Sequence, residues 1–455
     1  MEIPLPEEAF NKSSYYKIDR MNDRKGFATV ICLFAYIVFF TTLGFIKDPH
    51  NVFVDTTRKT WVSGDIFSYV HFPFLVTSVV LSLPIFFAIF LLQCVLPTAV
   101  IYLNSLISIL STALVVPILL FYLGMNNGLS HYPIELLICL VVALFHIYKS
   151  VTNFKINWTV TSIVFNATFS MIFKSIIVLL PSLVIITIFG IGTLIVFRSI
   201  VALNLVWYPR PSPPFALASS VMLLMLSNVF SNSLQAIVSM FMSATVAFKL
   251  HENKGLNFFE ALLKTLSLRL GSASFAIERS LINKCVSVCN VLLKTPLSKT
   301  KFGMKLAKFV SEQTSRQERI TPFIFVGYYG HTYIHSSCGL DEKIKQSSMS
   351  GIVTEFHMRE MVDSITRSTI CIVMPVIMFF SYMMYGGSVS YFSLLSYFAL
   401  SQVLNLFGAF VLSVGEIIVF DSIEQLAEGS ILGNFSGLIQ TLSENMPLGG
   451  FNRVN

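Results

Sequence analysis

The chain is poor in charged residues. Only 12% of its 455 residues are Asp, Glu, Lys or Arg, whereas 54% are hydrophobic. A soluble protein carries about twice that charged fraction to cover its surface. The shortage of charge therefore excludes an ordinary soluble protein, and we expect most side chains to face lipid or other apolar side chains.

Motifs for nucleotide or metal chemistry are also absent. The sequence holds no P-loop, no dinucleotide fingerprint and no GxSxG motif. Its seven cysteines include no CxxC pair, and the stretch HTYIH at 331–335 lacks the glutamate of a zinc-binding HExxH motif. We therefore expect no enzyme activity, no cofactor and no bound metal. Any transport would have to draw its energy from a gradient.

What the chain does contain is a series of long apolar stretches, and a membrane-crossing helix needs about 20 such residues. Stretches of this length exclude transmembrane strands, which are shorter and alternate in polarity. The pattern predicts an all-α, polytopic transmembrane helix bundle of about ten spans, in which a membrane domain at 26–421 separates a tail at 1–25 from a tail at 422–455. The predicted spans are 26–46, 72–92, 98–123, 133–148, 176–206, 215–248, 266–293, 320–338, 368–386 and 391–420.

Basic residues give the expected orientation. They are concentrated in the tail 1–25, which favours a cytoplasmic N-terminus, and ten spans would make both termini cytoplasmic. The equally basic segment 294–319 would then lie outside. Either 266–293 or 320–338 does not cross simply, or 294–319 lies on the membrane as an amphipathic helix. The net charge of +7 indicates contact with anionic lipid of the bilayer, and we expect no nucleic-acid partner.

Four residues are candidates for binding a substrate, because polar and ionisable groups inside a membrane are costly. Glu278 lies in LGSASFAIERSLINKC, and Glu416 lies in FVLSVGEIIVFDS. Tyr328 and Tyr329 lie between glycines in PFIFVGYYGHTYIHSSCG, where a helix could unwind and expose π faces to an organic cation. The alternatives are a local ion pair for Glu278, a position near the interface for Glu416, and ordinary interfacial aromatics for the tyrosines.

Four stretches occur in an order that resembles a known family. They are KSIIVLLPSLVIITIFG, LRLGSASFA, IFVGYYGHTYIHSS and IIVFDSIEQLAEG, and together they cover roughly residues 160–430. The order is similar to that of the choline transporter-like family, including its fungal pH-nine-sensitive branch. The resemblance implies ten spans, cytoplasmic termini and movement of choline or related amines. Ala276 stands where the family usually has glycine, and Glu278 and Arg279 replace apolar residues.

These observations favour a transporter that moves a small, cationic, choline-like solute across the plasma membrane by alternating access. Two other hypotheses stay open. The chain could be a non-transporting scaffold or sensor that binds partners through its basic loops. It could also be a lipid-handling protein whose charged groove in 266–293 admits headgroups.

Overall fold

The computed structural model is all-helical and contains no strand in the part of the chain that it describes. The described residues are 23–47, 72–125, 133–207, 213–250, 257–276, 300, 303–308, 321–346, 353, 356–385 and 389–427. An apolar chain in lipid must pair its backbone groups internally, and the helix does so within one segment. The eight longest described helices are α1 (Arg24–Lys47), α3 (Phe72–Val95), α4 (Pro97–Met125), α6 (Pro133–Asn153), α8 (Ile176–Trp207), α9 (Pro213–Leu250), α16 (Met358–Tyr385) and α17 (Val389–Ala427).

Shorter helical pieces connect these long helices. They are α7 (Thr159–Lys174), α10 (Phe258–Lys264), the π-helix η3 (Thr265–Arg269), the 3-10 helix η4 (Leu270–Ala273), α13 (Pro322–Tyr329) and α14 (Tyr333–Gln346). α10 begins with a capping box. The Glu260 backbone N–H donates to the Asn257 side chain, and the Asn257 backbone N–H donates to the Glu260 side chain. This box explains why a helix starts inside 249–265, a segment that hydrophilicity alone marks as a loop.

Five described helices contain an apolar stretch long enough to cross a membrane, which confirms the prediction of a polytopic membrane protein at this coarse level. The stretches are Arg24–Gly44, Val76–Val95, Leu179–Phe197, Leu226–Ala247 and Phe398–Ser422. The predicted spans 98–123, 133–148 and 368–386 coincide with the helices α4, α6 and α16, whose described residues do not reach the same apolar length.

The prediction of a single span at 320–338 is wrong. The segment forms two helices, α13 and α14, which are separated at Gly330 and its two successors. α13 has eight residues and is about 12 Å long, whereas the hydrocarbon core is about 30 Å thick. Of the predicted span 266–293, the structure describes residues 266–276. These residues continue the helical run that begins with α10.

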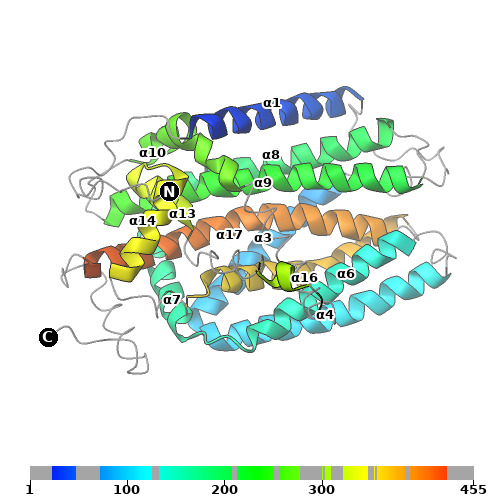
Figure 1. Ribbon diagram of the computed structural model, residues 1–455. Coiled ribbons are helices and arrows are strands. Elements are labelled where there is room, and N and C mark those ends of the chain that lie inside the picture. Colours follow the sequence, from blue (N-terminus) through cyan, green and yellow to red (C-terminus); the bar gives the residue numbers. More distant parts are fainter. Residues whose placement is uncertain are drawn as a thin grey trace.

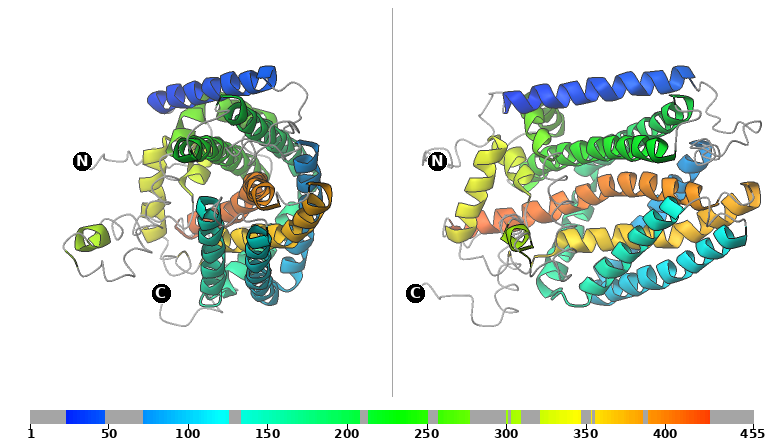
Figure 2. Two further views of the ribbon diagram at one scale, coloured as in Figure 1. Left: turned by 90° about the vertical axis from the view of Figure 1, so that its right-hand side faces the viewer. Right: turned by 45° about the vertical axis from the view of Figure 1, so that its right-hand side comes forward.

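α17 lies in the middle of the bundle, between two groups of helices (Figures 1 and 2). It contacts α9 and α8 on one side and α16 and α3 on the other. Of the most apolar 18 residues within Phe398–Ser422, 89% are buried. α1 lies at the edge, against α8, and α4 and α6 pack beside α16 on the opposite edge.

One end of the bundle carries the shorter helices α10, α13 and α14, together with the beginning of α1 and the end of α17 (Figure 1). α7 contacts α17, α3 and α4 at the same end. Asp23, just before α1, is hydrogen-bonded to the first residue of α14, and α14 contacts α17. The broken segment is therefore surrounded by elements from distant parts of the chain.

Candidate functional site at the α13–α14 break

α13 is a short helix whose eight residues are all buried. Pro322 occupies its first turn, where the missing N–H of proline costs nothing. It ends at Gly330, whose φ of +79° lies in the left-handed region that favours glycine, and the Gly330 N–H donates to the Val326 carbonyl at 2.9 Å. Gly327 serves close packing instead, because a Cβ there would overlap the backbone of Met240 on α9.

The N-terminal end of α13 is held by Glu416 of α17. The Thr321 N–H donates to Glu416 Oε2 at 3.0 Å, and the Thr321 hydroxyl donates to the same oxygen. Glu416 is fully buried between helices, at the end of the bundle that carries the break. An acidic group suits this place, because the N-terminus of a helix carries partial positive charge.

The C-terminal end of α13 is held by Arg269, the last residue of η3. Arg269 Nη1 donates to the Gly327 carbonyl at 2.7 Å, and the side chain is only 2% exposed. A cation complements the partial negative charge at a helix C-terminus, and π-helical turns such as η3 are frequent at functional sites. The sequence reasoning missed Arg269, although an arginine within the apolar run LRLGSASFA is itself a signal of a functional position.

A third charged side chain caps α14. Asp23 Oδ2 accepts hydrogen bonds from the Tyr333 N–H at 3.2 Å and from the Ser272 hydroxyl at 2.6 Å. The ring of Tyr333 also stacks on Phe275, with centroids 4.6 Å apart. Every helix end at the break therefore meets a side chain of complementary sign from another element. Asp23 was also missed, because it precedes the first apolar stretch and nothing local marks it.

Tyr328 and Tyr329 form a buried aromatic cluster with α17. Their rings lie 5.3 and 6.0 Å from Phe420, one helical turn beyond Glu416, and 4.9 Å from each other. His331 lies 6.0 Å from Tyr329. The two tyrosines are 0% and 2% exposed, so a solute could reach their π faces only after the helices separate.

The four predicted site residues are thus only partly brought together. Tyr328 and Tyr329 lie at the C-terminal end of α13, and Glu416 holds its N-terminal end on the same face of α17 as Phe420. Glu278 lies outside the described residues. The arrangement can hold or release a short helix at both of its ends, and it can present aromatic faces when that helix moves.

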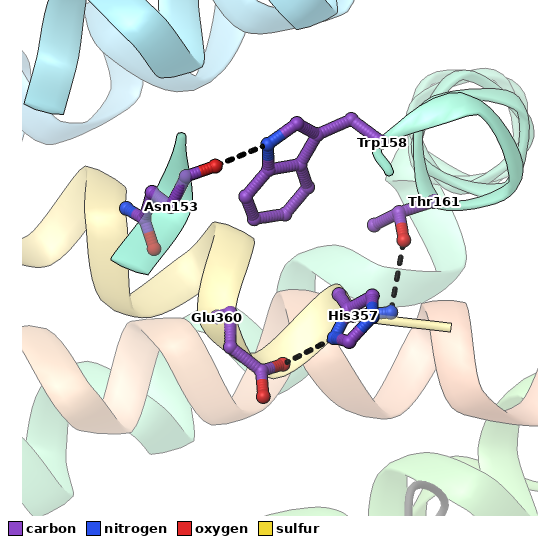
Figure 3. Close-up of polar contacts among 5 residues, drawn as sticks. All are labelled: Asn153, Trp158, Thr161, His357 and Glu360. Atoms are coloured by element: carbon purple, nitrogen blue, oxygen red, sulfur yellow. Dashed lines mark hydrogen bonds and ion pairs between the residues drawn. The ribbon is translucent and has the colours of Figure 1, made fainter. Parts of the chain in front are cut away.

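A second polar cluster joins the corner between α6 and α7 to the start of α16 (Figure 3). Trp158 Nε1 donates to the backbone carbonyl of Asn153 at 3.0 Å, and the backbone N–H of His357 donates to the Thr161 hydroxyl at 2.9 Å. His357 Nδ1 lies 3.8 Å from a carboxylate oxygen of Glu360. These contacts fix the corner. Within the described ranges, no group of three His, Cys, Asp or Glu could hold a metal ion.

Comparisons with known proteins do not assign the chain to a family. No family model matches it, and no curated protein matches it either. The similarity to the choline transporter-like family therefore rests on the four ordered motifs alone.

Proposed function

We propose that the chain is a multi-pass membrane transporter in which the α13–α14 break is the moving part of the solute path. The observation that carries this proposal is the interrupted helix itself, buried between α9 and α17 and held at its ends by Glu416, Arg269 and Asp23. Interrupted helices are typical of transporters, where unwound backbone and helix ends contact the solute, and here the interruption lies at one end of the bundle.

The solute proposed is a small organic cation of the choline type. The aromatic cluster of Tyr328, Tyr329 and Phe420 supplies π faces for such a cation. Because these rings are buried, binding requires the helices around α13 to separate, which is the motion that alternating access provides. The absence of a P-loop leaves an ion or solute gradient as the energy source.

We also propose a cytoplasmic location for the end of the bundle that carries the break, in the plasma membrane. This orientation draws support from the basic residues of the tail 1–25 and of the segment 294–319. α13, α14 and the start of α16 lie at the same end as the start of α1 (Figure 1). If everything between α9 and α16 stays at that end, both basic segments face the same side and the conflict with the positive-inside rule disappears.

Uptake by the purified full chain in proteoliposomes tests the proposal. We expect saturable uptake of labelled choline or ethanolamine. Tyr329→Leu, which keeps a large apolar side chain but removes the π face, should raise KM for the cation about tenfold, the equivalent of a cation–π contact of about 1.4 kcal/mol. Tyr329→Phe, which keeps the ring, is the matched control and should stay within about twofold of the unmodified protein.

A transporter of another kind, or no transporter, would give a different result. The absence of saturable uptake with both amines, together with no thermal shift of the purified protein by either, would remove this substrate class. Lipid movement between leaflets under the same conditions would instead favour the lipid-handling hypothesis. Equal loss of uptake in both tyrosine variants would argue against π-face binding.

A further inference from the structure

α9 carries a regular polar stripe that winds around the helix, from contacts with α17 to a contact with α13. Four serines and one glutamine recur at every fourth residue over about 24 Å, and because four residues turn an α-helix by about 400°, each lies about 40° further around the helix than the one before. We call these residues the α9 polar stripe: Ser227, Ser231, Gln235, Ser239 and Ser243. α9 and α17 are central helices, so the stripe runs through the interior of the bundle.

The stripe connects the break to a glutamine deeper in the bundle. At one end, Ser243 lies against Gly327 of α13. Further along, the hydroxyl oxygens of Ser413 on α17 and of Ser239 lie 3.1 Å apart, within hydrogen-bond distance. At the other end the Ser227 hydroxyl donates to the side-chain oxygen Oε1 of Gln402 at 2.7 Å, and the Ser231 hydroxyl donates to the backbone carbonyl of Gln402 at 3.3 Å.

Gln402 has hydrogen-bonding capacity that its surroundings do not use. Its side chain is 3% exposed, and among the described residues Nε2 has no hydrogen-bond partner. If the side-chain amide were turned over, Nε2 would lie beside Ser227 and Oε1 would take the other position. In either orientation, one polar atom of the amide then has no partner among the described residues. A buried polar atom without a partner costs about 1–3 kcal/mol, and its presence calls for an explanation.

Close packing explains the serines but not the glutamine. Small side chains let membrane helices approach each other, so a serine stripe alone would indicate an interface. Gln402 has a long side chain and lies opposite the stripe. An apolar side chain of similar volume would fill the same space equally well, so packing alone does not explain the amide. An amide at this position is useful when a bound group completes its hydrogen bonds, and a hydroxyl suits either orientation because it both donates and accepts.

We propose that the α9 polar stripe continues the solute path from the break into the bundle, and that Gln402 determines specificity by hydrogen-bonding a hydroxyl group of the solute. This inference rests on the proposed transport function and narrows the substrate class to small hydroxyl-bearing solutes. The aromatic cluster and Gln402 are separated by most of the length of the stripe, so they would act on the solute in succession.

Competition against labelled choline uptake tests the role of Gln402. The two competitors are unlabelled choline, which has a hydroxyl, and tetramethylammonium, which has a similar cationic group and no oxygen. In Gln402→Met, which keeps volume and removes the amide, the inhibition constant of choline should rise about tenfold, a typical value for one lost hydrogen bond of about 1.4 kcal/mol. That of tetramethylammonium should stay within about twofold.

Two results in an active Gln402→Met variant would overturn the proposal. An equal rise for both competitors would show a general packing effect, and unchanged constants for both would mean that Gln402 holds only a water molecule. If the unmodified protein takes up neither amine, the proposed transport of these amines fails independently of Gln402. The water accessibility of cysteines placed on the stripe then tests whether a solute path runs along it.

Cysteine labelling provides that test. In a variant without native cysteines, Ser231→Cys lies on the stripe, and Ala244→Cys lies on the opposite side of the same helix and is equally buried. A membrane-impermeant methanethiosulfonate reagent should modify the first in proteoliposomes and leave the second unmodified. Labelling of neither cysteine, or of both at the same rate, contradicts a hydrated path along the stripe.

Discussion

α1 and α17 are almost equally hydrophobic and have opposite surroundings. Of the most apolar 18 residues in each helix, 11% are buried in α1 and 89% in α17. α1 lies at the edge of the bundle, where Val38 and Phe39 are exposed, and α17 lies at its centre. Lipid tails are as apolar as a protein interior, so hydropathy reports that a helix avoids water and does not report what it packs against.

The largest expected effect comes from removing one large side chain from each helix. Phe410 of α17 is 2% exposed, and Phe39 of α1 is 57% exposed. Phe410→Ala should destabilise the protein by about 3–5 kcal/mol, because the cavity cannot close fully. Phe39→Ala should cost below about 1 kcal/mol, because lipid or detergent fills the space. Unfolding of both variants in the same detergent measures the difference; equal costs would contradict the central position of α17.

The next effect concerns the acidic group that α17 has and α1 lacks. Glu416→Ala removes the acceptor for the Thr321 N–H and hydroxyl, and it should destabilise the protein by about 1.5–3 kcal/mol. Glu416→Gln keeps a carbonyl acceptor and should lose less than half as much. Unfolding in detergent gives both values. If Gln is as harmful as Ala, the negative charge itself is required, for example in coupling or solute binding.

A smaller effect tests a place where α1, although at the edge, is closely packed against its neighbour α8. A Cβ at Gly44 would lie 2.7 Å from the Ser199 carbonyl oxygen of α8. Gly44→Ala should therefore cost about 1–3 kcal/mol by overpacking. Gly192→Ala on α8 is the control, because no atom lies within 4 Å of that Cβ, and alanine should stabilise the helix by up to about 1 kcal/mol. A neutral Gly44→Ala would mean that α1 is held loosely.

The smallest effect compares two single hydroxyls. Among the described residues, the Ser413 hydroxyl on α17 bonds the Ala409 carbonyl and Ser239, whereas the Thr42 hydroxyl on α1 bonds the Val38 carbonyl of its own helix alone. Ser413→Ala should cost about 1 kcal/mol, since it also removes a partner of α9. Thr42→Val should stay within about 0.5 kcal/mol of zero. Thermal unfolding under identical conditions separates the two, and a similar shift for both would weaken the α9–α17 contact as a stabilising one.

Much of the fold follows from local patterns. Long apolar stretches predict α1, α3, α8, α9 and α17, because their length and hydropathy suffice for a membrane helix. The span predicted at 320–338 failed because hydropathy over 19 residues does not register one glycine in a left-handed conformation. The glycines around Tyr328 and Tyr329 did signal a break, and Gly330 is where the helix ends.

The candidate site was harder to predict. Glu416 and the tyrosines were found because polar and aromatic groups in apolar stretches are conspicuous. Arg269 and Asp23 were missed, since their importance comes from partners 58 and 310 positions away in the chain. No spacing rule within one segment reveals such a pair, and no family match supplies it.

The sequence by itself determined that this chain forms membrane-length helices, because twenty apolar residues without charge can satisfy their backbone in lipid only as a helix. It also marked where that pattern is interrupted. Only the tertiary structure decided which helices face lipid and which form the core, and which charged side chains hold the ends of α13 and α14. Those outcomes depend on contacts between segments far apart in sequence. Hydropathy does not reveal these contacts, because a helix that faces lipid and a helix that faces protein can be equally hydrophobic.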